Sequence, residues 1–274
     1  MTTTFLRRST RILVLNPNSS VSMTHGVEEA IRGMGLAESL IRPQSTEIYT
    51  YTGPPESPAS INDGSDVLQS SEAVYRNLAS SGSLQQYDAV LVACFSVHPL
   101  VERLAELHGA RGKLIVTGIF EASILASLFL LTTPPLETAP PRKWGIVTTG
   151  KFWEVHLTKG VNTFLGTDPS SANNKFAGVE STGLDAGDFH GGVDPSVIQR
   201  RLKDATKRLL SKGAVDCVVM GCAGMAGLEE IIRSAAIEQY GQEQGSQVFI
   251  IDGVKAGIGL LEQTVRNKNM FQKV

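Results

Sequence analysis

The sequence contains few cysteines and few aromatic residues, and it has no charge excess. Among its 274 residues there are three cysteines, and aromatic residues make up 6%. Three is an odd number and too few for a disulfide framework, so we expect a reduced, cytoplasmic protein. CxxC pairs are absent, and neither Cys217 nor Cys222 has a histidine at ligand spacing. We therefore expect no metal site.

The charge and the apolar runs exclude further classes of protein. A net charge of -2 argues against a nucleic-acid partner, because proteins that follow phosphates usually carry a basic excess. No apolar stretch follows the two arginines of residues 1–10, so no secretory signal is expected. The most apolar run, residues 119–131, contains Glu121 and is shorter than the roughly 20 residues of a membrane-spanning helix. It predicts a buried helix and no membrane partner.

Short apolar runs recur along the chain, separated by helical patterns. This alternation is typical of parallel strands that are covered by helices on both faces. The predicted strands are residues 11–18, 46–51, 88–95, 113–120, 144–149, 175–181, 215–224 and 247–253.

The eight predicted strands form two sets of four, in the same order and about half a chain apart. The matching pairs are Ile12 with Gly145, Glu47 with Phe176, Cys94 with Cys222, and Leu114 with Val248. Between the sets lies a proline-rich segment, residues 132–144, which reads as a linker. The sequence predicts an α/β fold of two similar halves related by a pseudo-twofold axis, each a four-stranded parallel sheet with flanking helices.

A cysteine closes the third predicted strand of each half. Helical patterns follow Cys94 from Pro99 and follow Cys222 from Ala226. Ligands of open parallel sheets bind beyond the carboxyl ends of the strands, where helix N-termini favour thiolates. The alternative is that both cysteines pack as small apolar side chains. Cys217, which points to the opposite strand face inside an apolar run, is predicted to be a core residue.

Two opposed thiols suit the inversion of a stereocentre. One base removes a proton from one face, and an acid delivers a proton to the other; a cysteine with a pKa lowered toward 7 can do both. The developing enolate needs hydrogen-bond donors. The candidate donors are the backbone N–H groups of Phe95, Ser96, Ala223 and Gly224. Since neither a pyridoxal context for lysine nor a glycine-rich phosphate loop is present, we expect a small-molecule substrate and no cofactor.

Several segments resemble the Asp/Glu/hydantoin racemase superfamily, and within it the hydantoin and allantoin racemases. The resemblance covers nearly the whole chain and rests on ILVLNPNSS (12–20), TGPP (52–55), ACF (93–95), GIVTT (145–149), STGL (181–184), GCAGMAGLE (221–229) and IDGVKAG (251–257). It implies an active site between the two halves and a C-terminal helix that packs on the first half. The implied domains are residues 1–117 with 254–274, and residues 118–253.

The resemblance also implies roles for individual residues. It makes Cys94 and Cys222 the catalytic pair. The implied substrate-binding residues are Asn18, Phe95, Ser96, Thr148, Thr149, Gly183, Ala223 and Gly224. Asn18 could equally serve the Asn-Pro-Asn turn alone. Thr148 and Thr149 occupy the equivalent place in the second half, and for them too a substrate contact and a purely structural role are equally favoured. We expect a homo-oligomer.

The sequence departs from the bacterial hydantoin racemases after the first cysteine. Those enzymes usually carry a Gly-Asp-Pro-Gly type of segment, whereas residues 96–99 are Ser-Val-His-Pro, which resembles a fungal, allantoin-associated branch. His98 could contact substrate, although starting a helix before Pro99 is the simpler role. Residues 53–66 could form a solvated loop or a lid.

Other functions remain open on the sequence. An amino-acid racemase of the superfamily would typically show Cys-Asn-Thr and Cys-Thr-His, which are absent. A decarboxylase would keep only one cysteine, and a cis-trans isomerase is a further alternative. A non-catalytic binding protein would not need a thiol at both strand ends.

Overall fold

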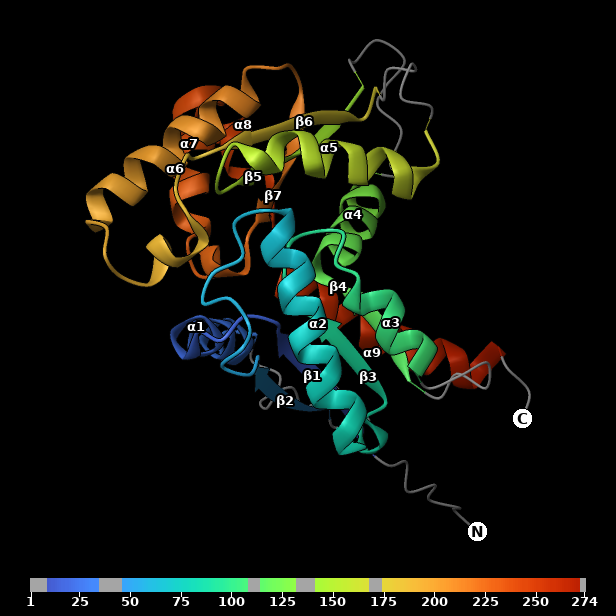
Figure 1. Cartoon of the computed structure of the whole chain (residues 1–274). Coiled ribbons are helices and arrows are strands. Elements are labelled where there is room, and N and C mark those ends of the chain that lie inside the picture. Colours follow the sequence, from blue (N-terminus) through green and yellow to red (C-terminus); the bar gives the residue numbers. More distant parts are fainter. Residues whose placement is uncertain (1–8, 35–45, 108–113, 132–140, 168–173, 272–274) are drawn as a thin grey trace.

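The structure, a computed structural model, describes residues 9–34, 46–107, 114–131, 141–167 and 174–271, and its chain forms two four-stranded sheets (Figure 1). The first sheet has the order β2-β1-β3-β4 and the second the order β6-β5-β7-β8, with every pair parallel. The strands are β1 (Thr10–Asn16), β2 (Thr46–Thr52), β3 (Ala89–Val92), β4 (Ile115–Gly118), β5 (Lys143–Thr148), β6 (Phe176–Ser181), β7 (Val215–Gly221) and β8 (Phe249–Asp252). All eight predicted strands are confirmed, and the repeated order confirms the two similar halves. Most of the predicted linker, residues 132–140, lies outside the described residues.

Helices cover both faces of the first sheet because its strands are apolar on both sides. Leu13 and Leu15 of β1 face α2 (Gly64–Ser81) and α3 (Leu100–Leu107). Ile12 and Val14 alternate with them and face the opposite way, toward α1 (Val21–Arg32) and α9 (Gly253–Phe271).

The second sheet has the same layered arrangement. Trp144 and Ile146 of β5 face α4 (Ile119–Leu130) and α5 (Phe152–Leu165). Val147 faces the other way, toward α6 (Pro195–Leu210) and α7 (Glu229–Tyr240), and a short α8 (Gln242–Ser246) packs on α7. The inner faces of both sheets contribute to one buried cluster, so the halves share a central core.

Two helices cross between the halves. α4 follows the first sheet in sequence but contacts β7 and β8 of the second, while α9 follows the second sheet and packs on β1, β3 and β4 of the first. α4 and α9 also contact each other, at the junction between the upper and lower halves in Figure 1. The buried helix predicted at residues 119–131 is confirmed as α4. Within the described ranges, no helix has the length and apolarity to cross a membrane.

Strand register places the two cysteines at equivalent positions. Val14 of β1 pairs with Leu91 of β3, and Ile146 of β5 pairs with Val219 of β7, and all four side chains face the central core. Each cysteine comes three residues after its core-facing partner, Leu91 or Val219.

The same register corrects the predicted alignment of the first strands. Ile12 corresponds to Trp144 and not to Gly145, because both residues face the central core and pair with the equivalent residues Ala89 and Cys217. The offset inferred from sequence was therefore wrong by one residue for this pair of strands.

Candidate active site

Cys94 and Cys222 line one cavity between the two halves, at the carboxyl ends of β3 and β7. Its volume is about 30 Å³, room for one or two water molecules. The lining residues are Asn18, Met23, Ile61, Ala93, Cys94, Phe95, Thr149, Trp153, Ala186, Gly221, Cys222 and Ala223. We call this space the shared cavity. A ring-shaped ligand can enter it only if the walls move apart.

The Cys94 thiol is a weak acid in this environment. The pKa of Cys94 is raised to about 12, mainly by burial and in smaller part by the Cys222 sulfur and the Glu121 carboxyl, against a hydrogen bond with Ser96 that lowers it. The Ser96 Oγ lies 3.4 Å from Sγ of Cys94. The charge of a Cys222 thiolate would therefore oppose ionisation of Cys94.

The Cys222 thiol is also a weak acid, though less so. Burial raises the pKa of Cys222 to about 11, while backbone N–H groups of Gly224 and Met225 lower it. The Gly224 N–H donates to Sγ of Cys222 at 3.3 Å. The expected lowering of both thiol pKa values toward 7 is therefore wrong, because the loss of hydration outweighs the donors.

The helices that were expected to lower these pKa values begin too far along the chain. α3 starts at Leu100 and α7 at Glu229, six and seven residues after the cysteines. A helix dipole acts mainly within its first turn. Cys222 is followed directly by only a three-residue 3₁₀ segment, Ala223–Met225.

Cys217 is fully buried in the central core, as predicted. Its sulfur lies 3.7 Å from Oγ of Ser127 on α4. Burial raises the pKa of Cys217 to about 12. Cys94 and Cys222 differ from it by being partly exposed.

The Asn-Pro-Asn turn holds Asn18 against the cavity. The Oδ1 of Asn18 accepts from the Ser20 N–H at 2.9 Å and from Nδ2 of Asn16 at 2.9 Å, and its own Nδ2 contacts the Met23 sulfur. The predicted turn role of Asn18 is confirmed. Its place in the cavity wall also leaves substrate contact as a prediction.

Six of the ten predicted site residues line the shared cavity, and four do not. Ser96 and Gly224 lie behind the wall and hydrogen-bond the two thiols. Thr148 donates its hydroxyl to the carbonyl of Gly221 at 2.9 Å. Gly183 is exposed and has a positive φ of 75°, and its N–H donates to the carbonyl of Thr149.

Histidine 98 is turned away from the cavity. Its Nδ1 accepts from the Leu100 N–H at 3.3 Å, and its Nε2 lies 3.1 Å from the hydroxyl of Ser70 on α2. Burial lowers the pKa of His98 to about 3, so the imidazole is neutral. The simpler role, starting the helix after Pro99, is the one that the structure supports.

The loop at residues 53–66 contributes to the wall. Ile61 is only 5% exposed and lines the shared cavity. Asn62 accepts a hydrogen bond from the backbone of Ala186 at 3.3 Å, which joins this loop to the second half. The loop therefore covers the junction of the halves, as a lid would.

Six lining residues were not among the sequence candidates: Met23, Ile61, Ala93, Trp153, Ala186 and Gly221. Trp153 could have been suspected, since it follows β5 at the same edge of the sheet as Thr149. Ile61 and Ala186 come from long connections whose path no local pattern reveals.

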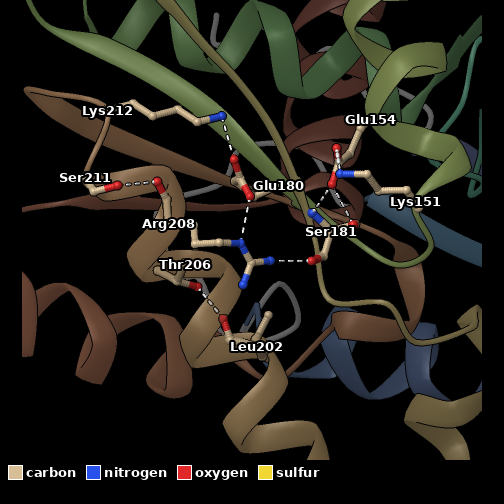
Figure 2. Close-up of polar contacts among 9 residues, drawn as sticks. All are labelled: Lys151, Glu154, Glu180, Ser181, Leu202, Thr206, Arg208, Ser211 and Lys212. Carbon is tan, nitrogen blue, oxygen red and sulfur yellow. Dashed lines mark hydrogen bonds and ion pairs between the residues drawn. The ribbon is translucent and has the colours of Figure 1, made fainter.

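A polar network fixes the start of α5, the helix that carries Trp153, and Figure 2 shows the contacts of its neighbours Lys151 and Glu154. Glu154 accepts from both the N–H and the hydroxyl of Ser181 at the end of β6, and pairs with Lys151. Ser181 is tied to α6 as well, because its carbonyl accepts from Arg208 at 2.7 Å. These contacts lock the start of α5 to the end of β6.

Two titratable groups stand behind the thiols without lining the shared cavity. The Oε2 of Glu121 and the Nε2 of His190 are buried and have no hydrogen-bond partner among the described residues. A Cβ built on Gly224 would lie 3.2 Å from Nε2 of His190 and 3.5 Å from Sγ of Cys222, so both atoms flank Gly224. The lining itself carries no charged side chain.

The part of the chain that the structure describes contains no cluster of histidine, cysteine and carboxylate groups that could hold a metal ion. The chemistry available to the shared cavity is thus that of two thiols, amide and hydroxyl groups, and backbone N–H donors.

Comparison with known proteins gives consistent matches over the whole chain. The sequence model of Asp/Glu/hydantoin racemases matches residues 12–261. An uncharacterised protein of Schizosaccharomyces pombe is 33% identical over 95% of this chain and 94% of its own length. A hydantoin racemase of Paenarthrobacter aurescens is 26% identical over 93% and 91%. The solved structure of an allantoin racemase from Klebsiella pneumoniae, 23% identical, covers 94% of this chain and 89% of its own with a TM-score of 0.69, which shows a common fold.

Proposed function

Because the chain belongs to the Asp/Glu/hydantoin racemase family and is thereby an isomerase, we propose that it inverts the C5 stereocentre of a 5-substituted hydantoin, without a cofactor. Allantoin is the first candidate, since the similar proteins include hydantoin and allantoin racemases. The observation that carries the proposal is the pair Cys94 and Cys222, at equivalent strand ends and on one cavity.

The proposed reaction needs one thiolate and one thiol. The thiolate removes the C5 proton from its face, and the C5–H electron pair moves into the ring carbonyl to give an enolate. The opposite thiol then donates its proton to the other face of C5, so the two cysteines exchange protonation states. Phe95 and Ala223 line the cavity, and their N–H groups donate to no acceptor among the described residues, so they can bind the enolate oxygen.

The interaction between the two thiols favours a state in which one is ionised and the other keeps its proton. Removing a proton from one thiol makes removal from the second harder, because the Cys222 charge raises the pKa of Cys94. The two groups therefore titrate as a pair, in which the singly ionised form precedes the doubly ionised one. The singly ionised form is the one that can invert a stereocentre.

The uncharged lining supports a ring amide over an amino acid. A free amino acid would bring a carboxylate and an ammonium group into a wall that offers no charged partner, and unpaired buried charges are costly. A hydantoin ring is neutral and presents N–H and C=O groups, which match the amide of Asn18, the hydroxyl of Thr149 and the free backbone N–H groups. Its stereogenic proton is also more acidic than that of an amino acid.

Polarimetry and proton NMR in deuterated water test the proposal directly. Each enantiomer of allantoin, benzylhydantoin and methylhydantoin is incubated with the enzyme, and the spontaneous racemisation of each is subtracted. We expect loss of optical rotation with deuterium appearing at C5 of the inverted product. Enzyme-dependent inversion without deuterium, or no inversion of any of the three, would refute the proposed reaction.

A further inference from the structure

A second cavity lies behind the Cys94 loop, between α4 and α5. Its volume is about 350 Å³, compared with about 30 Å³ for the shared cavity, and falls in the range of small-molecule sites. Phe120 and Gly160 are buried and line its inner part, while Val97 and Phe164 are exposed and line its mouth. None of its lining residues belongs to the shared cavity. We call it the back cavity.

Two buried polar atoms of the back cavity have no hydrogen-bond partner among the described residues. They are the Oε2 of Glu121 and the Nε2 of His156, and buried polar groups are normally hydrogen-bonded. Burial raises the pKa of Glu121 and, with the nearby Lys159 charge, lowers the pKa of His156. The shift of His156 favours the neutral imidazole, which can donate one hydrogen bond, while burial makes the Glu121 carboxyl easier to protonate against backbone N–H groups of Glu121 and Gly118 that lower its pKa.

The charge at this cavity is positive and unbalanced. Lys159 lines the cavity and is exposed, and no carboxylate pairs with it among the described residues. Glu121 is the one acidic residue in the described lining, and burial raises its pKa, which weakens its opposition to the Lys159 charge. An anion is therefore favoured here, and the rings of Phe120 and Phe164 favour one with an apolar body.

We propose that the back cavity binds a small monocarboxylate with an aromatic or branched apolar body. The carboxylate accepts hydrogen bonds from Lys159 and from His156, and it lies within the reach of the Glu121 carboxyl, which joins them when it carries a proton. The apolar body lies between Phe120 and Phe164. This assignment gives both unpartnered buried atoms a partner.

The wall of the back cavity packs directly on the wall of the shared cavity. Phe120 packs edge-to-face on Phe95, with ring centroids 5.5 Å apart, and Phe95 follows Cys94 and lines the shared cavity. On the other side, a Cβ on Gly160 would lie 2.6 Å from the Val97 side chain, so α5 already presses on the same loop. An occupant of the back cavity restricts the loop that carries Cys94, and we expect it to lower kcat.

Fluorine NMR on the whole protein tests binding without reference to catalysis. The probe is 4-fluorophenylacetate, with 4-fluorophenylacetamide as its uncharged match. We expect saturable broadening of the acid's signal, with a Kd of about 1 mM or lower, and at least about fivefold weaker binding of the amide. Only the expected loss of kcat depends on the proposed racemase activity, so the two proposals can fail separately.

Three variants locate the probe. Lys159→Gln is exposed, and it should weaken binding of the acid about fivefold or more while leaving the amide unchanged. Lys207→Gln removes the same charge from α6, where the lysine is partly exposed and pairs with Glu238 far from this cavity's lining, and as the control it should change neither. In the wild type, binding should tighten as the pH falls and Glu121 and His156 gain protons, whereas Glu121→Gln, whose amide always donates, should lose the part that Glu121 contributes and keep only the part from His156.

The proposal is overturned by any of three results. One is no saturable binding of the acid up to about 20 mM. Another is that Lys159→Gln and Lys207→Gln weaken binding of the acid equally, or that neither variant weakens it. The third is binding that disappears as the protein concentration is raised, which would assign the cavity to a contact between copies of the chain.

Discussion

The walls that carry Cys94 and Cys222 are equivalent in strand register but differ in chemistry. Cys94 is followed by a loop, its sulfur has one side-chain hydroxyl, that of Ser96, and the carboxyl of Glu121 raises its pKa. Cys222 is followed by a 3₁₀ turn whose backbone N–H groups point at its sulfur. The fold supplies two thiols, and the segments after the strands set how acidic each one is.

This difference indicates which thiol ionises first. Backbone N–H donors stabilise the Cys222 thiolate, whereas Cys94 has the Ser96 hydroxyl in their place and the Glu121 carboxyl raises its pKa, so Cys222 has the lower pKa, about 11 against about 12. His190, whose imidazole burial keeps neutral by lowering its pKa, flanks the same side. We therefore expect Cys222 to carry the charge when one thiol of the pair is ionised.

The largest expected effect comes from removing either thiol. Serine in place of Cys94 or Cys222 cannot ionise near neutral pH, so racemisation should fall by about 10³-fold in each variant, the range of general acid–base catalysis. Each variant keeps one base, so it should exchange the C5 proton of one enantiomer with solvent deuterium, without inversion. The two variants should prefer opposite enantiomers, as measured by NMR. Near-normal racemisation in either variant would rule out the two-thiol mechanism.

The alkylation rates of the three cysteines depend both on the exposure of each sulfur and on the pKa of each thiol. All three cysteines have raised pKa values, so alkylation rates at pH 8 to 9 should depend on exposure as well as on ionisation. We expect Cys222 to react up to about tenfold faster than Cys94, which corresponds to one pKa unit, and Cys217 to react slowest because it is fully buried. Peptide mass mapping after brief iodoacetamide treatment measures all three. If Cys217 reacts first, its assignment to the core is wrong.

The pH dependence of kcat/KM should follow the ionisation of the thiol with the lower pKa. In the proposed reaction the reactive form is the thiolate, and its population rises as the pH approaches the thiol pKa of about 11. Below that value, kcat/KM should increase about tenfold per pH unit between pH 7 and 9, once spontaneous racemisation is subtracted. A profile that is flat above pH 7 would mean that one thiol is already ionised there, and that substrate or enzyme motion offsets the burial.

The fold and the cysteine pair could be predicted from sequence because both depend on local patterns. Apolar runs of strand length predicted all eight strands, and repetition of Cys94 and Cys222 at strand ends placed both on one cavity. The thiol pKa values could not be predicted, because burial between two halves is a tertiary property. Nor could the parts of the wall formed by Ile61 and Ala186, since the loops that carry them meet only in the folded chain.

The smallest expected effect isolates one hydrogen bond. Ser96 is fully buried, and its hydroxyl lowers the pKa of Cys94, so Ser96→Ala should raise that pKa. A lost hydrogen bond of about 0.5–1.5 kcal/mol corresponds to about 2- to 12-fold less thiolate. Alkylation of Cys94 should slow by that factor, while Cys222 in the same molecule stays unchanged and serves as the internal control. The two enantiomers have equal free energy, so kcat/KM must remain equal in both directions whatever the variant. Any asymmetry can therefore appear only in kcat and KM taken separately, or in the rate of deuterium exchange. Equal slowing of both thiols would show that Ser96 acts on the cavity as a whole, and the difference between the walls would then lie in the backbone donors to Cys222 alone.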